Sequence, residues 1–250
     1  MSRIAVAGAT GTLGARIVER LIAKGHDVAP ISRSAGVDLH TGAGLTEALT
    51  GAQAVVDASN AFPTDPEADL VETLVQATRH LVEAAQAAGV ERLVAVSIAN
   101  VEDPAFDHFP YYVAKREQEK VVAGSALDTT IVKTTQWHEF ATNPAAVTFE
   151  DAEVLVEDWL LQPVAVDAVA DVVVTHVLES SSAAVVQLTG PEQVRLPELT
   201  QRLLAARGDD RPVRTLPAAL PELSTGVLLA PESAQATGPT VAQWLRTQHG

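Results

Sequence analysis

Residues 7 to 14 read AGATGTLG, and this glycine-rich stretch decides the fold that the sequence predicts. It follows an apolar run at residues 4 to 7 and precedes an amphipathic stretch. A turn without side chains lets the backbone approach a diphosphate, and the helix that follows points its N-terminus at the anion. The motif, Gly8-x-x-Gly11-x-x-Gly14, differs from the commonest spacing G-x-G-x-x-G, and tight strand–helix packing is the alternative explanation. Its position between a predicted strand and a predicted helix favours phosphate or dinucleotide binding.

The composition argues against several classes of protein. The 250 residues, 47% of them apolar, suffice for one large domain or two small ones. The net charge of −15 disfavours general nucleic-acid binding, because an acidic surface repels phosphate backbones. No apolar run approaches the ~18 residues of a membrane span, and the N-terminus enters a strand without a signal peptide, so a cytoplasmic protein is expected. The chain has no cysteine, and its histidines lack metal-binding spacing, so neither a disulfide nor a metal site is expected.

Apolar strands alternate with helical stretches along the first half of the chain. The pattern predicts strands at residues 3–8, 26–32, 52–59, 91–97 and 128–134, and helices at residues 12–24, 45–49, 66–88 and 111–122. Continuous apolar strands separated by helices indicate a parallel sheet covered on both faces. Right-handed crossovers then give a Rossmann-like, doubly wound α/β fold.

The pattern loosens from Trp137 onward. Helices are expected at residues 167–179 and 196–207 and a strand at 184–190, and prolines crowd the region after residue 212. We therefore expect a single NAD(P)-binding Rossmann-type domain over residues 1–250. A small C-terminal substrate lobe, roughly residues 137–165 and 190–250, is expected to be interleaved with the sheet.

The loop after the second predicted strand bears on the choice of dinucleotide. An acidic residue there would repel a 2′-phosphate, whereas this strand ends in Ser32-Arg33-Ser34. The guanidinium of Arg33 suits a phosphate and the two hydroxyls add donors, which favours NADP(H) over NAD(H). An ordinary exposed loop arginine is the alternative. Asp38 has two interpretations, a hydrogen-bond acceptor for an adenine amino group or a loop cap.

Ser97, Tyr111 and Lys115 form a candidate catalytic set. Ser97 ends a predicted strand, where ligands bind in such folds. Tyr111 and Lys115 lie four residues apart on one helix face, and an ammonium beside a phenol lowers the pKa of that phenol. Such a tyrosine can exchange a proton with a carbonyl or alcohol oxygen. Chance spacing is the alternative, and Tyr112, which points about 100° away from Tyr111, remains a second candidate.

Taken together, GATGTLG, VSI, YYVAK and TIVKTTQWHEF resemble the short-chain dehydrogenase/reductase superfamily. The resemblance is to its atypical branch of NAD(P)-binding proteins, similar to the nitrogen-metabolite-repressor (NmrA) type, and it covers most of the chain. It implies a Rossmann fold with NAD(P) as ligand, and it places Ser97, Tyr111 and Lys115 on the serine and the Y-x-x-x-K of the superfamily. Some members of this branch bind the dinucleotide without turnover.

The resemblance also implies which residues contact the dinucleotide. Those around the pyrophosphate would be Gly8, Thr10, Gly11, Thr12, Leu13 and Gly14, with Arg33 near the 2′-phosphate. Those along the adenosine-side ribose and phosphates would be Ala58, Ser59 and Asn60, and those facing the nicotinamide would be Thr134, Thr135 and Gln136. Phe62, Trp137 and His138 are candidates for the substrate pocket. Phe62 and Trp137 are alternatively core residues, and His138 alternatively caps a short helix.

These observations favour an NADP(H)-dependent oxidoreductase, a carbonyl- or quinone-type reductase or the reverse dehydrogenase. In it Tyr111 transfers the proton, Lys115 tunes Tyr111 and holds the ribose, and Ser97 orients the reacting oxygen. The alternative is a non-catalytic NADP(H) sensor of the NmrA type. A sugar-nucleotide epimerase or dehydratase is disfavoured by Arg33 and by the few basic residues of the later lobe. The expected partner is a small-molecule substrate, with neither nucleic acid nor membrane, and a monomer and a homodimer are both open.

Overall fold

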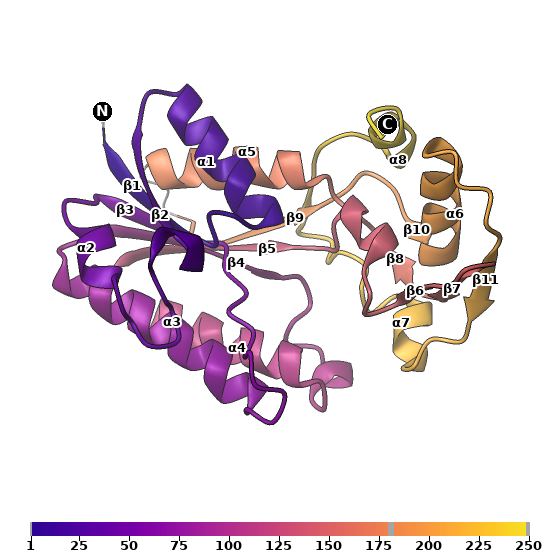
Figure 1. Ribbon diagram of the computed structural model, residues 1–250, viewed down its shortest axis with the longest axis horizontal. Helices are drawn as coiled ribbons and strands as arrows, with labels where there is room; N and C mark the ends of the chain where they lie inside the picture. Colours follow the sequence, from indigo (N-terminus) through magenta and orange to yellow (C-terminus); the bar gives the residue numbers. More distant parts are fainter. Residues whose placement is uncertain (1, 180–182, 249–250) are drawn as a thin grey trace. The chain divides into compact units, whose positions relative to one another are not determined.

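The computed structural model describes residues 2–179 and 183–248 (Figure 1). The chain divides into two compact units, each built from two stretches of sequence. Unit 1 comprises Met1–Lys133 and Val169–Val186, and unit 2 comprises Thr134–Ala168 and Gln187–Gly250.

A seven-stranded parallel sheet forms the centre of the Rossmann-like fold, as the sequence predicts. The strand order is β12-β9-β5-β4-β3-β1-β2. The strands span β1 (Arg3–Ala7), β2 (Asp27–Ile31), β3 (Ala54–Asp57), β4 (Arg92–Ile98), β5 (Asp128–Thr134), β9 (Val185–Thr189) and β12 (Gln235–Ala236). The inner strands β1 and β3 are buried over nearly their whole length, which explains their continuous apolar sequences.

Helices cover both faces of this sheet in unit 1. The helices are α1 (Thr12–Ala23), α2 (Leu45–Leu49), α3 (Leu70–Ala87), α4 (Pro110–Ala123) and α5 (Val166–Leu178). α1 and α5 lie on one face, and α3 and α4 lie on the other (Figure 1). On α1 the buried side chains Leu13, Ile17 and Leu21 recur every four residues, so one stripe of the helix packs on the sheet.

The strand order places a topological switch point beside β1. The chain leaves β1 to form β2 on one side and then returns to form β3 on the other. In doubly wound sheets, ligands bind outside the carboxyl ends of the strands at such a point. The turn after β1 and the loop after β3 therefore meet where a ligand is expected.

The long helix α3 begins at Leu70, four residues later than the sequence predicts. The Asp69 carboxylate accepts a hydrogen bond from the Glu72 amide at 2.9 Å and caps the helix, whereas the Asp65 carboxylate accepts from the Glu67 amide within a preceding turn. Local aspartate turns compete with helix formation, and they extend the loop after β3 up to Asp69.

Unit 2 contains short elements that the hydrophobic pattern does not reveal. A three-stranded sheet of order β11-β7-β6 and a two-stranded pair β10-β8 accompany one longer helix, α6, and two short ones. Their bounds are β6 (Val147–Phe149), β7 (Val154–Glu157), β8 (Leu160–Leu161), β10 (Val194–Arg195), β11 (Val213–Leu216), α6 (Leu196–Ala206), α7 (Pro221–Thr225) and α8 (Val241–Leu245). Among the described residues of the whole chain, no helix is long and apolar enough to cross a bilayer.

Candidate functional site

The glycine-rich turn after β1 leaves no room for side chains at two of its three glycines. Gly8 has a φ of +76°, and a Cβ there would lie 2.6 Å from the Ala58 carbonyl oxygen. A Cβ on Gly14 would lie 2.0 Å from the Gly8 carbonyl oxygen. Both distances are far below van der Waals contact, so the turn, α1 and the loop after β3 pack backbone against backbone. Gly11 is exposed, and a Cβ on it would lie 3.2 Å from the Gly8 oxygen.

The N-terminus of α1 has the features of an anion site. Gly11 is the N-cap residue, no side chain caps the helix, and the first turn contains no acidic residue. The first amides of the helix therefore lack side-chain acceptors, and their partial positive charge favours an anion. Thr10, Gly11 and Thr12 are exposed at this end, whereas the Leu13 side chain is buried and leaves only its backbone to a ligand.

The loop after β2 presents an arginine to solvent. Arg33 begins a short 3₁₀ turn, Arg33–Ala35, and its side chain is exposed without a hydrogen-bond or ion-pair partner in the described part of the chain. The hydroxyls of Ser32 and Ser34 lie 3.0 Å apart. Asp38 instead stabilises its own turn, because its carboxylate accepts from the His40 amide at 2.9 Å and from the Thr41 hydroxyl at 3.2 Å. Both carboxylate oxygens of Asp38 thus have hydrogen-bond partners within the loop.

The end of β3 contains a buried carboxylate that the sequence analysis missed. Asp57 accepts hydrogen bonds from the Ser59 amide at 3.0 Å and from the Ser59 hydroxyl at 2.6 Å. These two bonds fix the backbone of Ala58 and Ser59 just before Asn60. The sequence indicates this residue through the aspartate that ends the apolar strand AVVD, because a buried polar group needs a hydrogen-bond partner.

Tyr111 lies beside this loop, at the start of α4. Its hydroxyl donates a hydrogen bond to Oδ1 of Asn60 at 3.1 Å, and its ring stacks on Phe62 with 5.6 Å between the ring centroids. Burial raises the pKa of Tyr111, although the Asn60 hydrogen bond acts in the opposite direction. Tyr112 instead stacks on Phe106, with centroids 3.8 Å apart. Tyr111 is therefore the tyrosine that the fold brings next to Asn60.

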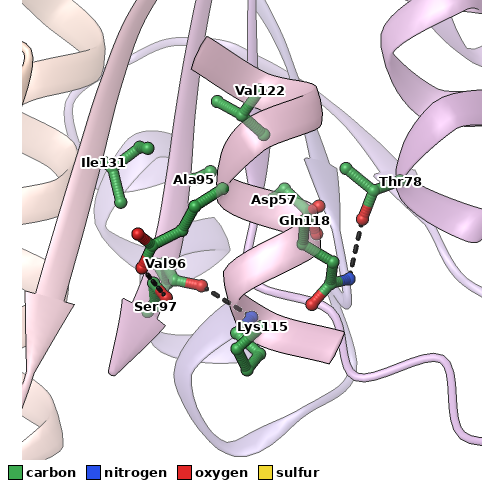
Figure 2. A pocket seen from close by; sticks show the side chains of 10 residues that line it. Asp57, Thr78, Ala95, Val96, Ser97, Lys115, Gln118, Val122 and Ile131 are labelled. Atoms are coloured by element: carbon green, nitrogen blue, oxygen red, sulfur yellow. Dashed lines mark hydrogen bonds between the residues drawn. The ribbon is translucent and has the colours of Figure 1, made fainter. Parts of the chain in front are cut away.

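Lys115 is buried one turn further along α4. Its Nζ donates to the Val96 carbonyl oxygen at 3.0 Å (Figure 2). Burial lowers the pKa of Lys115, and the nearby charges of Asp57 and Glu119 oppose that shift. No hydrogen bond joins Lys115 to Tyr111 among the described residues, so the ammonium faces the strand.

Ser97 lies in the same interior region, at the end of β4. Its hydroxyl donates to Oε1 of Glu119 at 2.5 Å, and Oε2 of Glu119 lies 2.8 Å from Nζ of Lys133, which also pairs with Glu102. Burial alone would lower the pKa of Lys133, but its hydrogen bonds to Glu102 and Glu119 outweigh burial and raise it. Sequence reasoning singled out Ser97 alone of these four residues.

A cavity of about 10 Å³ lies between β4 and α4, close to the size of one water molecule. Figure 2 shows Ser97 and Lys115 at one end and Gln118 at the side of α4 that faces Thr78. Nε2 of Gln118 donates to Thr78 at 2.7 Å, while its buried Oε1 has no partner. This space excludes a substrate, so any substrate must approach from outside it.

The predicted nicotinamide and substrate residues near Trp137 belong to unit 2. Thr134 accepts a hydrogen bond from the Trp137 indole at 3.1 Å, and the Thr135 hydroxyl donates to the Gln162 carbonyl oxygen at 2.6 Å. The backbone oxygen of Gln136 accepts from the Val164 amide at 2.9 Å, and its side-chain Oε1 is buried without a partner.

His138 lies in the packed interior of unit 2. It begins a 3₁₀ helix, His138–Thr142, and its ring packs against Trp244 with 4.9 Å between the centroids. The side chain is fully buried, neither ring nitrogen has a hydrogen-bond partner, and burial lowers the pKa of His138 to about 4. The ring is therefore neutral. His138 begins the short helix without capping it, because Trp137 is the N-cap residue and no side chain caps this helix.

Comparison with known proteins identifies the family. The sequence profile of a family described as NAD(P)H-binding matches residues 8–180. The chain belongs to this NAD(P)H-binding family. The match begins at Gly8 and includes the turn after β1, Asn60, Tyr111 and Lys115. Membership confirms a nicotinamide dinucleotide as the cofactor, and it agrees with the resemblance to the NAD(P)-binding branch of the short-chain superfamily.

Two curated proteins are similar to part of this chain. Photosystem II assembly factor Ycf39 from Guillardia theta is 34% identical over 140 residues, which cover 50% of this chain and 43% of that protein. L-arabinose 1-dehydrogenase (NAD(P)(+)) from Haloferax volcanii is 35% identical over 134 residues, which cover 50% of each chain. The chain thus spans about half the length of the curated relatives it matches.

Solved structures share the fold over nearly the whole chain. A short-chain dehydrogenase/reductase superfamily protein from Agrobacterium tumefaciens with bound NAD superposes with a TM-score of 0.73 at 17% identity, covering 99% of this chain and 96% of that chain. An NADPH-dependent quinone oxidoreductase from Escherichia coli complexed with NADPH gives 0.70 at 18% identity, covering 98% and 99%. At such identities the likeness shows the fold alone.

The described residues fit the dinucleotide of the NAD(P)H-binding family. The side-chain-free turn and the uncapped start of α1 suit a pyrophosphate, and the unpaired Arg33 guanidinium suits a further phosphate. Among the described residues, no three histidine, aspartate or glutamate side chains are grouped as metal ligands.

Proposed function

We propose that the protein is an NADP(H)-dependent oxidoreductase that reduces a carbonyl or quinone-type substrate or catalyses the reverse dehydrogenation. The observation that carries the proposal is the position of Tyr111. Its hydroxyl is held by Asn60 at the carboxyl end of β3, in a chain of the NAD(P)H-binding family, with Lys115 one helical turn away. The activities for which the dehydrogenase relative and the quinone oxidoreductase are named support this class of reaction.

Tyr111 is the proposed proton donor. Because its pKa is raised, the phenol is protonated at neutral pH, which is the form that a reduction requires. The dinucleotide supplies the hydride when it is bound. Tyr111 then donates its proton to the substrate oxygen, and Asn60 holds the hydroxyl in place before the substrate arrives.

Lys115 and Ser97 have supporting roles in the proposal. Lys115 is proposed to hold the ribose, and its positive charge, one helical turn from Tyr111, would stabilise the phenolate that forms when Tyr111 loses its proton. Since the Ser97 hydroxyl donates its hydrogen bond to Glu119, the Ser97 oxygen can only accept a hydrogen bond from the substrate. Ser97 therefore orients the alcohol form of the substrate by accepting a hydrogen bond from its hydroxyl.

The preference for NADP(H) is assigned to the loop after β2. The exposed guanidinium of Arg33, flanked by Ser32 and Ser34, would bind the 2′-phosphate through charge-assisted hydrogen bonds. The remaining contacts are proposed as the sequence predicts them, from Gly8, Thr10, Gly11, Thr12, Leu13, Gly14, Asp38, Ala58, Ser59, Asn60, Thr134, Thr135 and Gln136. Phe62 and Trp137 are proposed to contact the substrate, as the sequence predicts.

A second candidate is a dinucleotide-dependent binding protein without turnover. The similarity to the assembly factor Ycf39 favours it, because that protein is named for assembly. Such a protein would bind both redox forms of the dinucleotide and would change its affinity for a partner protein with the form bound.

Steady-state oxidation of NADPH over a panel of aldehydes, ketones and quinones tests the proposal, with wild type compared with Tyr111→Phe. We expect turnover by wild type, and a loss of about 10²-fold or more in Tyr111→Phe at unchanged NADPH affinity. Equal rates in the two proteins would refute the role of Tyr111. Binding of both redox forms with no turnover on any substrate would favour the second candidate.

A further inference from the structure

Four side chains form a continuous series beneath the proposed site, and we call them the Glu119 series. They are Ser97 on β4, Glu119 on α4, Lys133 on β5, and Glu102 in the loop after β4. The exposed fraction of the side chain rises from 8% at Lys133 and 14% at Glu119 to 63% at Glu102. The series thus runs from the interior of unit 1 to its surface.

Glu119 is fixed at both of its oxygens. Oε1 accepts the Ser97 proton at 2.5 Å, and Oε2 lies 2.8 Å from the Lys133 ammonium. A carboxylate whose two oxygens are bound by a hydroxyl and an ammonium is fixed in one orientation. Because Ser97 donates to that carboxylate, the orientation of its hydroxyl is set by Glu119.

Glu119 also lies one helical turn after Lys115, on the same face of α4. A buried ammonium is costly unless opposite charges face it. The charged groups that face Lys115 are Asp57 on β3 and Glu119 on its own helix, with Lys133 on β5 behind Glu119. The neighbours contributed by α3 and β4, Thr78 and Ser97, are neutral.

We propose that Glu119 is a positioning residue for the reaction, which provides a counter-charge to the buried Lys115 ammonium and fixes the Ser97 hydroxyl as an acceptor toward the substrate. This inference rests on the proposed function, which gives Lys115 and Ser97 their roles. Glu102 and Lys133 tie Glu119 to the surface loop, and the Lys133 charge partly offsets the effect of Glu119 on Lys115. Asp57 provides the second counter-charge of Lys115.

Substitutions of Glu119 and of Lys133 should shift the titration of Lys115 in opposite directions. Neutralising Glu119 removes a negative charge, so Lys115 should lose its proton at lower pH. Removing the Lys133 charge leaves Glu119 uncompensated, so Lys115 should lose its proton at higher pH. A loss of packing alone predicts no such pair of opposite shifts.

The test is an NMR titration of protein labelled with ¹³Cε-lysine, without cofactor or substrate. The chain has only four lysines, at positions 24, 115, 120 and 133, so each signal can be assigned by a lysine-to-arginine variant. The variants are Glu119→Gln and Lys133→Met. The matched control is Glu117→Gln on the same helix, because Glu117 is 42% exposed and pairs with Lys120 at 2.7 Å.

We expect Glu119→Gln to move the Lys115 titration to a pH about one unit lower than in the wild type, Lys133→Met to move it upward, and Glu117→Gln to leave it in place. An unmoved or equally moved signal in Glu119→Gln and Glu117→Gln overturns the proposal. Should Glu119→Gln not fold, Lys133→Met decides, since a downward or absent shift there also overturns it. The readout needs no turnover, so a failure of the proposed reaction is recognised separately, by inactivity over the substrate panel.

Discussion

The Tyr111 hydroxyl donates a hydrogen bond to Oδ1 of Asn60 over 3.1 Å, and this bond joins the start of α4 to the loop after β3. The same loop is fixed on its other side by Asp57, which binds the amide and hydroxyl of Ser59. The loop also meets the glycine-rich turn, since the Ala58 carbonyl lies against Gly8. Tyr111, the loop after β3 and the glycine-rich turn are thus connected through these contacts.

Gly14→Ala should weaken NADPH binding by about tenfold or more and destabilise the fold by ~1–3 kcal/mol. The reason is steric, because the new Cβ would lie 2.0 Å from the Gly8 carbonyl and push the turn out of place. Calorimetric titration with NADPH and thermal unfolding measure the two effects.

Gly25→Ala is the matched control for that substitution. Gly25 has a φ of +82° with no atom within 4 Å of its Cβ position, so the change costs ~1–2 kcal/mol through backbone conformation alone. NADPH affinity should remain at the wild-type value. Equal affinity losses in both variants would show that general destabilisation, and not the turn, controls binding.

Arg33→Ala should reduce NADPH affinity about ten- to hundredfold and leave NADH affinity nearly unchanged. The exposed guanidinium has no other described partner to lose, so folding should be unaffected. Parallel titrations of both dinucleotides against wild type and variant measure this. A wild-type protein that prefers NADH would contradict the assignment of the loop.

Burial of His138 makes stability depend on pH. The pKa of His138 is about 4 in the folded chain against about 6.5 when unfolded, so the unfolded chain takes up more protons between these values. Its stabilising contribution is therefore complete above pH 6.5 and is lost as the pH falls toward 4. The free energy of unfolding should drop by about 2 kcal/mol between pH 7 and pH 5 from this group alone.

Urea unfolding of wild type and His138→Leu at several pH values checks this expectation. In His138→Leu, the free energy of unfolding should lose most of its dependence on pH between pH 7 and pH 5, whatever the stability of the variant at neutral pH. His108→Leu, at an exposed position, is the control and should keep the wild-type slope. A His138→Leu slope equal to that of wild type would contradict the link to His138.

Features that depend on local sequence could be predicted, because their determinants lie close together along the chain. The turn from Gly8 to Gly14 lies between an apolar strand and an amphipathic helix, and the structure contains both. The sequence predicts the start of α3 four residues too early. Residues 66 to 69 continue the helical pattern, but the turn at Asp65 forms there instead and the helix begins after Asp69. In unit 2, strands of two to four residues are too short to show a period.

The interior part of the site could not be predicted, because its contacts join distant elements. Glu119 meets Lys133 across 14 residues of sequence and Ser97 across 22, and no spacing rule connects a helix residue to two strands. The sequence left His138 as a pocket residue or a helix cap and did not predict its burial, since that burial involves Trp244, more than 100 residues later. Choosing between Tyr111 and Tyr112 likewise required the ring contacts of Phe62 and Phe106.

The proposed function depends above all on proton transfer by Tyr111 in an NADP(H)-dependent reduction. Its most direct test is single-turnover hydride transfer from NADPH to the best substrate of the panel, in wild type, Tyr111→Phe and Tyr112→Phe, with NADPH affinity measured alongside. The account predicts a loss of about 10²-fold or more in Tyr111→Phe alone, at unchanged NADPH affinity in all three proteins. Transfer at the wild-type rate in Tyr111→Phe, or an equal loss in Tyr112→Phe, would contradict it.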